Sequence, residues 1–491
     1  MFRILRQACR TVCSAHFVKA SQSQFASWKL VSRWISTSQV KFSDNSQDDL
    51  EESDEFKTIR DEAQTGALGT DHQVFVIQPF IKWGKKMKRN TTRDFMLAES
   101  KALVSSIQGW RVVDSTIISL LSFDKKSFFG KGNLELLKRQ VRGDARVTAV
   151  FVSVDVLKLH QQKMLQDLFQ VPVFDRYMIV IQIFKAHAKT REARLQIAIA
   201  ELPYLWTRYR TIEDATNMNI TKGFLDSKRM VLMEREQKLK KALNKLKGQR
   251  EMMRNKKQRQ EFPTVAVVGY TNCGKTTLIK ALTDDDSLVP RNQLFATLDV
   301  TTHEGMLPNR LRILYVDTIG FISNIPTTLL EPFKVTLEDA MLADIIIHVV
   351  DVSNPDYLQQ KQHVDETLQH LELEEKILEH VLVVGNKVDA VPPGERVTEE
   401  YDLLISATRG TGLAQLKEKV QDMILEATGR KNITMRVRSG GSEYQWLMKH
   451  TAVSNIREDE TSAEHLLLDV VMTDVIMNKF KHEFISSRKR G

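Results

Sequence analysis

The sequence TVAVVGYTNCGKTTLIKAL, at residues 264–282, joins an apolar run to a glycine-containing loop and then to a helix-forming run. Residues 269–276 fit the pattern G-x-x-x-x-G-K-[ST] of a phosphate-binding loop. The apolar run predicts a buried strand, and the run after the loop predicts a helix whose N-terminus faces the phosphates. Lys275 would then reach the β- and γ-phosphates, and the Thr276 hydroxyl would bind Mg²⁺. This stretch therefore predicts an α/β domain with a mostly parallel sheet.

A second loop follows the apolar run LRILYV at residues 311–316. It reads DTIG at residues 317–320 and fits the pattern D-x-x-G. Asp317 would approach the Mg²⁺ shell, and the Gly320 backbone N–H would bind the γ-phosphate and so sense its presence. The pattern is short, and it gains weight from its place at the end of a predicted strand.

A third apolar run leads to the sequence NKVD at residues 386–389, which would choose the base. The Asp389 carboxylate would accept two hydrogen bonds, from guanine N1–H and from the exocyclic amine. Adenine offers no such pair and would leave a buried acceptor unsatisfied. We expect Asn386 on the N7 side of the base, the Lys387 stem over the ring, and the backbone of residues 406–408 near guanine O6. These loops in this order predict a GTPase that hydrolyses GTP to GDP and phosphate.

The remaining element, switch I, lies between Pro290 and Glu304, where a threonine must close over Mg²⁺ and the γ-phosphate. Thr297, Thr301 and Thr302 are all candidates, and spacing alone does not decide among them.

The N-terminal tail is basic. Residues 1–43 hold seven Lys or Arg and no acid, which accounts for most of the net charge of +9. This composition, with the sequence RWIS at residues 33–36, is typical of a mitochondrial transit peptide, and the alternative is a disordered basic arm. Cys9, Cys13 and Cys273 cannot build a disulfide framework, so we expect the folded body to lie in a reducing compartment or not to depend on oxidation. With the tail, the predicted location is the mitochondrial matrix. No apolar run is long enough to cross a bilayer.

The whole chain divides into six segments by composition and periodicity. We expect a transit peptide at 1–43, a flexible acidic linker at 44–71, an N-terminal α/β domain at 72–185, a helical hairpin at 186–261, the GTPase domain at 262–428 and a small α+β module at 429–491. Within the N-terminal domain, apolar runs at 73–80, 147–154 and 178–184 predict strands, and 91–107 and 133–141 predict helices. In the last module, 432–438 and 465–472 predict strands.

The predicted hairpin has apolar residues every three, four or seven positions on each arm, which favours an antiparallel helix pair with a polar tip near residues 211–224. Its second arm is strongly basic. From Lys228 to Arg259 there are thirteen Lys or Arg against three acids, a net charge of +10. Such a concentration predicts a contact with nucleic acid, and the alternative is a solvated helix face.

Six segments resemble the HflX family of translational GTPases over residues 72–425. They are GKGNL at 130–134, VFDR at 173–176, AKTRE at 188–192, QLFATLD at 293–299, DTIGFI at 317–322 and ADIIIHVVD at 343–351. With the basic tail, the chain resembles a mitochondrial member. The resemblance implies a monomeric factor that binds the large ribosomal subunit and its rRNA and acts in ribosome splitting, recycling, rescue or large-subunit maturation. A rival hypothesis is an RNA-binding assembly chaperone whose nucleotide state is secondary.

The resemblance also assigns residues. It makes Thr297 the Mg²⁺ ligand of switch I and directs the hairpin into rRNA. The residues expected to act in catalysis are Lys275, Thr297 and Gly320, and those expected to bind Mg²⁺ are Thr276, Thr297 and Asp317. The residues expected to contact GTP are Gly269, Tyr270, Thr271, Asn272, Cys273, Gly274, Lys275, Thr276, Thr277, Phe295, Ala296, Thr297, Leu298, Asp299, Asp317, Thr318, Ile319, Gly320, Asn386, Lys387, Val388, Asp389, Ser406, Ala407 and Thr408.

Three positions depart from common patterns. The hairpin tip reads NMNITKG at 217–223, with one glycine where the family usually has a glycine-rich G-E-T-Q segment. Val300 stands where a proline is common. Phe321 follows the DTIG loop, where many GTPases place the glutamine that orients the attacking water. Because phenylalanine cannot hydrogen-bond to water, the missing group must come from elsewhere, and the ribosome is the expected supplier.

Overall fold

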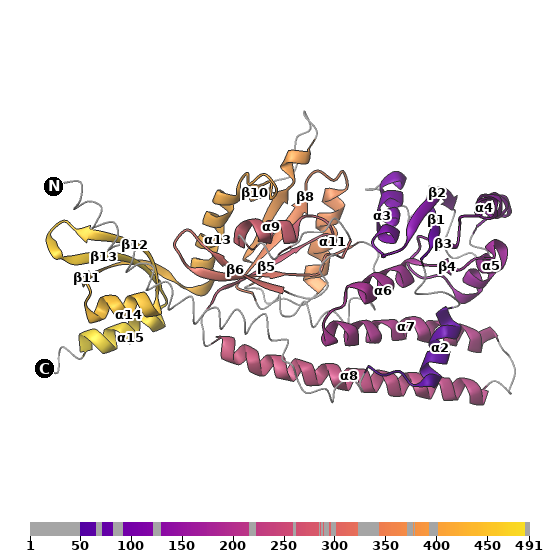
Figure 1. Ribbon diagram of the computed structural model, residues 1–491, viewed down its shortest axis with the longest axis horizontal. Helices are drawn as coiled ribbons and strands as arrows, with labels where there is room; N and C mark the ends of the chain where they lie inside the picture. The colour runs from indigo at the N-terminus through magenta and orange to yellow at the C-terminus, as the bar shows by residue number, and fades with distance from the viewer. Residues whose placement is uncertain are drawn as a thin grey trace, which may run out of the picture. The chain divides into compact units, whose positions relative to one another are not determined.

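The computed structural model describes residues 50–64, 71–81, 92–120, 129–215, 222–258, 262–283, 285, 288, 294–295, 301–322, 343–370, 377, 379–391 and 401–486 (Figure 1). The chain divides into two compact units, which are residues up to Glu51 and residues Glu52–Gly491. All elements described below belong to the second unit.

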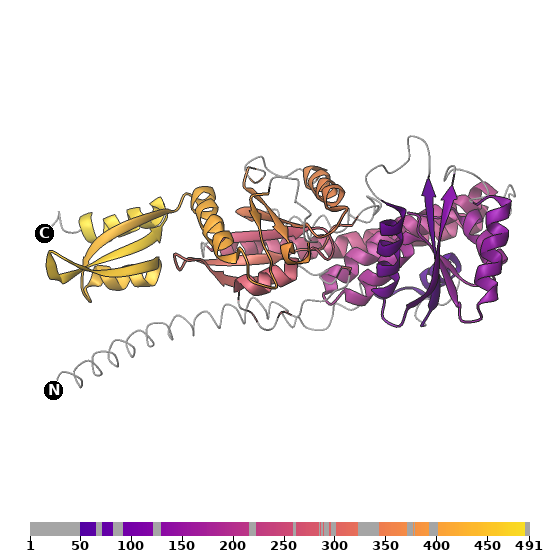
Figure 2. The same cartoon turned by 90° about the horizontal axis from the view of Figure 1, so that it is seen from above.

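A four-stranded parallel sheet forms the centre of the N-terminal region. Its strands are β1 (Gln73–Ile81), β2 (Arg111–Leu120), β3 (Ala149–Val152) and β4 (Val173–Phe174), in the order β2-β1-β3-β4. The covering helices are α3 (Arg93–Ser105), α4 (Lys131–Gly143), α5 (Leu159–Phe169) and α6 (Arg176–His187). Successive strand residues face opposite sides, so Val76 packs with α3 and α6 while Ile77 packs with α4 and α5 (Figure 2).

One expectation for this region was wrong, and strands β2 and β4 and helix α5 were not predicted. Residues 178–184, predicted as a strand, lie in α6 instead. The run is buried nearly all round, and such a run carries no periodicity that separates a strand from a core helix. The deciding feature is Asp175, whose side chain accepts a hydrogen bond from the Met178 N–H at 3.0 Å and so caps the helix.

Two long helices, α7 (Arg191–Ala215) and α8 (Lys222–Gln258), run antiparallel and pack side by side (Figure 1). Leu232 and Leu239 of α8 are fully buried, as the seven-residue repeat predicts. Helix α7 extends to Ala215, into the segment expected to be the tip, and it tolerates Pro203 in its interior. Residues 216–221, which include part of the tip sequence, lie outside the described residues.

A short helix lies within the segment that was expected to be a flexible linker. Helix α2 (Asp54–Gln64) contacts both α7 and α8. Its Phe56 and Ile59 are 3% and 2% exposed, and the Arg235 guanidinium of α8 lies 5.5 Å from the centre of the Phe56 ring. The acidic composition masked this apolar pair, whose three-residue spacing places both side chains on one helix face.

The region that holds the phosphate-binding loop is built on a six-stranded sheet. Its strands are β5 (Thr264–Gly269), β6 (Thr301–Met306), β7 (Arg312–Asp317), β8 (Ile345–Asp351), β9 (Val381–Asn386) and β10 (Leu403–Leu404), in the order β10-β9-β8-β5-β7-β6. Only β6, among these strands, pairs antiparallel. The main helices are α9 (Lys275–Thr283), α11 (Tyr357–His370) and α13 (Leu413–Thr428). Helices α9 and α13 pack on one face of the sheet and α11 on the other. The predicted α/β class with a mostly parallel sheet is confirmed.

The C-terminal module is a three-stranded antiparallel sheet of β11 (Lys431–Arg438), β12 (Ala452–Asp459) and β13 (Ser462–Met472), with β13 in the middle. Helices α14 (Ser442–His450) and α15 (Asp474–Phe480) lie on one face (Figure 1). Strand β12 was not predicted. Within the described part of the chain, no helix has the length and apolar character that a membrane span requires.

Candidate nucleotide-binding site

The phosphate-binding loop lies between the central strand β5 and helix α9. Parallel neighbours flank β5 on both sides, so the loop emerges at the carboxyl edge of the sheet, where α/β proteins bind ligands. Glycine is required at both ends of the loop. A Cβ at Gly269 would lie 2.3 Å from the Val349 carbonyl oxygen, and one at Gly274, whose φ is +98°, would lie 2.5 Å from Asn386 Nδ2.

Three of the residues predicted to bind phosphate or Mg²⁺ come together at this edge, namely Lys275, Thr276 and Asp317. Because β7 runs parallel to β5 in a register that pairs Val267 with Asp317, the aspartate lies beside the start of α9. The Thr276 hydroxyl donates to Asp317 Oδ2 at 2.7 Å. Lys275 is 7% exposed, and its Nζ donates to the carbonyl oxygens of Gly269 and Tyr270 at 3.2 and 3.0 Å. Hydroxyl and carboxylate oxygens are the ligands that Mg²⁺ prefers, so this pair fits the ion.

The end of the DTIG loop pairs with the phosphate-binding loop. The Phe321 N–H donates to the Gly269 carbonyl at 3.1 Å, and the Thr271 N–H donates to the Phe321 carbonyl at 2.6 Å. A Cβ at Gly320 would lie 2.8 Å from Thr271 Cγ2 and 3.1 Å from Lys275 Nζ, so glycine is the residue that fits between these two elements. The Phe321 side chain is 4% exposed and packs in an apolar cluster. It therefore fills space in the apolar core.

Asn386 holds two loops of the base site together. It is 1% exposed; its Nδ2 donates to the Cys273 carbonyl at 2.9 Å, and its Oδ1 accepts from the Ala407 N–H at 3.1 Å. We expected this side chain on the N7 side of guanine, and the structure shows it joining the phosphate-binding loop to the loop at 406–408. Cys273 itself is free and buried, and burial raises the pKa of its thiol.

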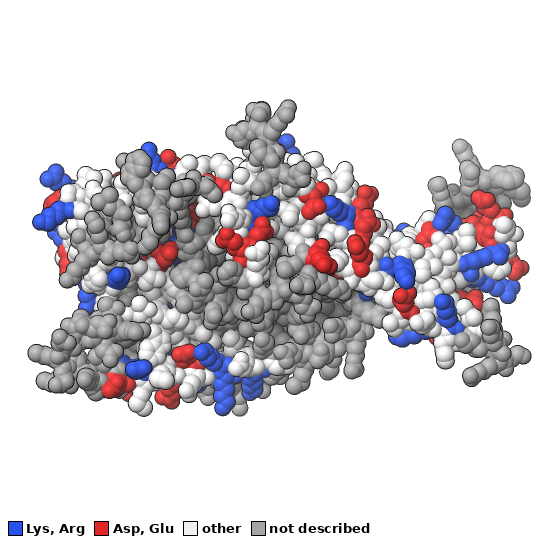
Figure 3. All heavy atoms as spheres, turned by 180° about the vertical axis from the view of Figure 1, so that it is seen from behind, with Lys and Arg blue, Asp and Glu red and all other residues white. Residues whose placement is uncertain are grey.

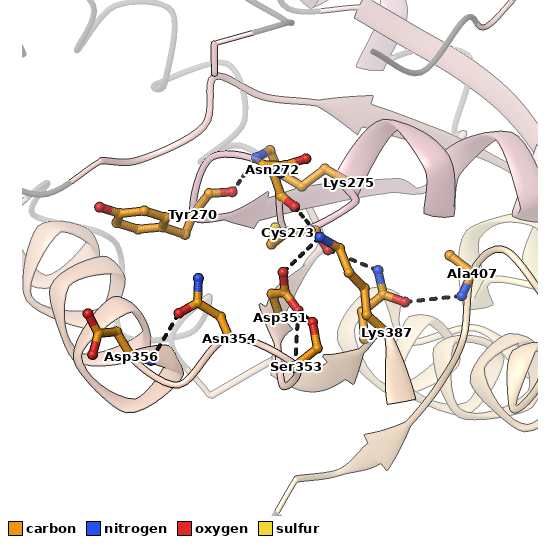
Figure 4. Close-up of polar contacts among 11 residues, drawn as sticks. Tyr270, Asn272, Cys273, Lys275, Asp351, Ser353, Asn354, Asp356, Lys387 and Ala407 are labelled. Atoms are coloured by element: carbon orange, nitrogen blue, oxygen red, sulfur yellow. Dashed lines mark hydrogen bonds and ion pairs between the residues drawn. The ribbon is translucent and has the colours of Figure 1, made fainter. Parts of the chain in front are cut away.

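Lys387 has a partner that the sequence alone did not reveal. Its Nζ donates to the Asn272 carbonyl and to Asp351 Oδ2, both at 2.7 Å (Figure 4). Asp351 ends strand β8, and its other oxygen accepts from the Ser353 N–H and hydroxyl. The signal available beforehand was an aspartate at the end of a buried parallel strand, one strand away from the NKVD loop.

Asp389 is prepared to act as an acceptor. A hydrogen bond from the Ser406 hydroxyl, assisted by Arg409 and Thr408, holds the pKa of Asp389 below its ordinary value. The carboxylate therefore stays ionised at neutral pH, with acceptor capacity for two N–H groups. The register of β9 and β10 brings residues 406–408 to Asp389, since Thr408 Oγ1 lies 3.4 Å from Asp389 Oδ2.

Switch I is described in part. Leu294 and Phe295 are buried, whereas Thr297, with Ala296, Leu298 and Asp299, lies outside the described residues. Of the other candidates, Thr301 and Thr302 begin strand β6, and Thr301 pairs with Asp317 across the antiparallel ladder.

The chain matches three family models. The model described as a 50S ribosome-binding GTPase covers residues 264–387, and two models described as the N-terminal and middle regions of a GTP-binding GTPase cover 94–185 and 187–257. The match at 264–387 holds the phosphate-binding loop, the DTIG loop and the start of NKVD.

Relatives of similar length are also known. GTP-binding protein 6 of Homo sapiens is 42% identical over 417 residues, covering 83% of this chain and 80% of that protein. A GTP-binding protein from Sulfolobus solfataricus, solved in complex with GDP, is 22% identical with a TM-score of 0.39, over 72% of this chain and 99% of that chain. GTPase HflX of Magnetococcus marinus is 32% identical over 413 residues, covering 81% of this chain and 93% of that protein. With this match along nearly the whole bacterial protein, and with the guanine-nucleotide loops assembled at one sheet edge, the chain belongs to the HflX family of GTPases, which hydrolyse GTP.

Proposed function

We propose that this protein is a mitochondrial GTPase that binds the large ribosomal subunit in its GTP state and leaves it after hydrolysis. Its work there would be the recycling or splitting of ribosomes and the maturation of large subunits. The observation that carries the proposal is a strongly basic, exposed helix face on the same chain as the phosphate-binding, DTIG and NKVD loops of a guanine-nucleotide site. The family model that matches residues 264–387 is described as ribosome-binding, which supports the same reading.

The basic face lies on α8. Among its described side chains, the helix buries Leu232, Arg235, Leu239, Ala242 and Leu243 on one side. The exposed basic residues on the described part of that face are Arg229, Lys238, Lys240, Lys241 and Lys245. Figure 3 shows Lys and Arg side chains at the lower edge of the molecule, with Asp and Glu side chains among them. A row of cations on one helix fits a phosphate backbone, whose charges recur along the strand.

The nucleotide site supports hydrolysis controlled from outside the chain. Thr276 and Asp317 would hold Mg²⁺ together with Thr297, and the ion would neutralise charge on the β- and γ-phosphates. Lys275 would exchange its contacts with loop carbonyls for contacts with phosphate oxygens. Because Phe321 is buried in an apolar cluster, the group that orients the attacking water would come from the ribosomal particle.

The test is co-sedimentation of the full chain with purified mitochondrial large subunits. Protein loaded with a non-hydrolysable GTP analogue should bind at least about tenfold more tightly than protein loaded with GDP, a difference of about 1.4 kcal/mol. Equal binding in the two states would contradict release by hydrolysis. Fusion of residues 1–43 to a fluorescent protein tests whether this segment directs the protein to mitochondria. A diffuse cytosolic signal would contradict a mitochondrial location.

The assembly-chaperone alternative rests on one feature, the charge of α8, which does not depend on nucleotide. A Lys275→Ala variant separates the two proposals, because it removes a phosphate contact and leaves α8 intact. Restored mitochondrial translation with this variant would favour the chaperone, and failed restoration with normal subunit binding would favour the GTPase cycle.

A further inference from the structure

We propose that Glu99 and Arg176 form a positioning pair that couples the phosphate-binding loop to the helical hairpin. The pair would transmit nucleotide state to α7 through helix α6. This inference rests on the proposed function for its purpose, but its geometry and its test concern the protein alone. It also gives a role to the VFDR segment at residues 173–176, which the nucleotide site does not use.

The pair meets the phosphate-binding loop through Tyr270, the second residue of that loop. Tyr270 Oη donates to Glu99 Oε2 at 3.2 Å, and Arg176 Nη2 donates to Glu99 Oε1. Tyr270 and Arg176 are only 5% and 4% exposed. Burial opposes the charge on Arg176, but Glu99 and Tyr270 raise the pKa of its guanidinium overall. The Glu99 carboxylate, whose side chain is 26% exposed, thus lies between a buried cation and a buried hydroxyl.

Tyr270 is in turn tied to the elements that sense the γ-phosphate. Its backbone pairs with Phe321 in a parallel bridge, directly after Gly320. Its carbonyl accepts a hydrogen bond from Lys275 Nζ at 3.0 Å. When Lys275 moves to phosphate oxygens and Gly320 moves toward the γ-phosphate, both changes act on Tyr270. The hydroxyl at the end of this side chain would carry the displacement to Glu99.

On its other side the pair is joined to the hairpin. Arg176 is the first residue of α6, and its two sequence neighbours both contact α7. Asp175 Oδ2 lies 3.5 Å from Tyr204 Oη, and Tyr177 donates its hydroxyl to the Ala200 carbonyl. The rings of Tyr177 and Tyr204 stack with centres 5.1 Å apart. Three consecutive residues therefore link Glu99 to the first arm of the hairpin, and α8 packs on that arm.

Switch I reaches the same two helices independently. The Leu294 N–H donates to Ser106 Oγ beside α3 at 3.2 Å, and Phe295 meets Phe184 of α6 edge to face at 4.9 Å. Helices α3 and α6 thus receive both nucleotide-sensitive segments, and Glu99 is the charged connection between the two helices.

The test is hydrogen exchange of backbone amides in the isolated full chain, loaded with a GTP analogue or with GDP. In the wild-type protein, amides of α7 around Ala200 should exchange at different rates in the two states. Glu99→Gln keeps the shape and removes the charge, and it should reduce this difference by about fivefold or more, the lower end of typical coupling between sites. Tyr270→Phe removes only the hydroxyl and should have the same effect, and the double variant should add nothing further.

The matched control is Ser100→Ala, the next residue on α3. It breaks a buried hydrogen bond of 2.7 Å to Gln78 and leaves Glu99 intact, so it should lower thermal stability and keep the exchange difference. The proposal is overturned if α7 exchanges alike in both states of the wild type, or if folded Glu99→Gln keeps the full difference. Sedimentation with large subunits is scored separately, so a protein that shows the exchange difference without binding ribosomes would refute the proposed function and leave the coupling intact.

Discussion

Asn386→Ala should separate the phosphate-binding loop from the loop at 406–408. The amide makes two buried hydrogen bonds, to the Cys273 carbonyl at 2.9 Å and from the Ala407 N–H at 3.1 Å. A buried polar group left without a partner costs about 1–3 kcal/mol, so two such groups cost about 2–6 kcal/mol. The nucleotide-free variant can relax by letting the loops part, but bound guanine requires them to meet. The cost therefore appears in binding, and its lower bound predicts a loss of GDP affinity of at least about 30-fold.

The measurement is equilibrium titration with a fluorescent GDP analogue, accompanied by a thermal melt of the nucleotide-free protein. Asn354→Ala is the matched control, because that asparagine caps a turn by accepting from the Asp356 N–H at 2.9 Å (Figure 4). The control should keep wild-type affinity. A folded Asn386→Ala variant that binds GDP within about threefold of wild type would refute the reasoning, since the two hydrogen bonds would then hold nothing that the nucleotide needs.

Three further predictions concern the base, the hairpin and the chemistry. Asp389→Asn should shift preference from GTP toward xanthosine triphosphate, whose position 2 carries a carbonyl, and unchanged GTP preference in competition binding would remove Asp389 from the site. Replacing Lys238, Lys241 and Lys245 with glutamate should weaken binding to large subunits. It should also lower the slope of the log binding constant against log salt concentration by roughly one per lost phosphate contact, with GTP binding of the isolated protein unchanged. Unaltered subunit affinity and slope would make the hairpin structural only. Intrinsic GTP hydrolysis should be slow, about 10⁻³ per second or less, and strongly stimulated by large subunits, because Phe321 cannot orient water. Single-turnover assays with and without the particles measure this, and a fast rate that subunits do not change would contradict an externally supplied group.

The sequence predicted those parts of the nucleotide site that residues close together in the chain form. The phosphate-binding loop and the DTIG and NKVD loops each need a fixed spacing of a few residues after a strand, so their patterns predict both the element and the place. The sequence also predicted the buried face of α8, because a seven-residue repeat places Leu232 and Leu239 on one side of the helix.

The sequence predicted other elements less well because their local pattern fits more than one kind of structure. Residues 178–184 are apolar on every side, and only the cap by Asp175 and burial among neighbouring elements make them helical. Helix α2 was read as a linker because charge dominates its composition. Its order comes from Phe56 and Ile59 packing against the hairpin, a contact between segments more than a hundred residues apart.

The sequence by itself thus identified a guanine-nucleotide-binding GTPase and predicted which loops form the site, because those loops are short and locally encoded. Only the tertiary structure decided how the loops are held. Asp351 meets Lys387 because β8 and β9 are neighbours, and Glu99 meets Tyr270 although 171 positions separate them. Such pairings depend on the order of strands and on which helices cover a sheet. That order results from burying all apolar faces at once, which no single segment of the sequence specifies.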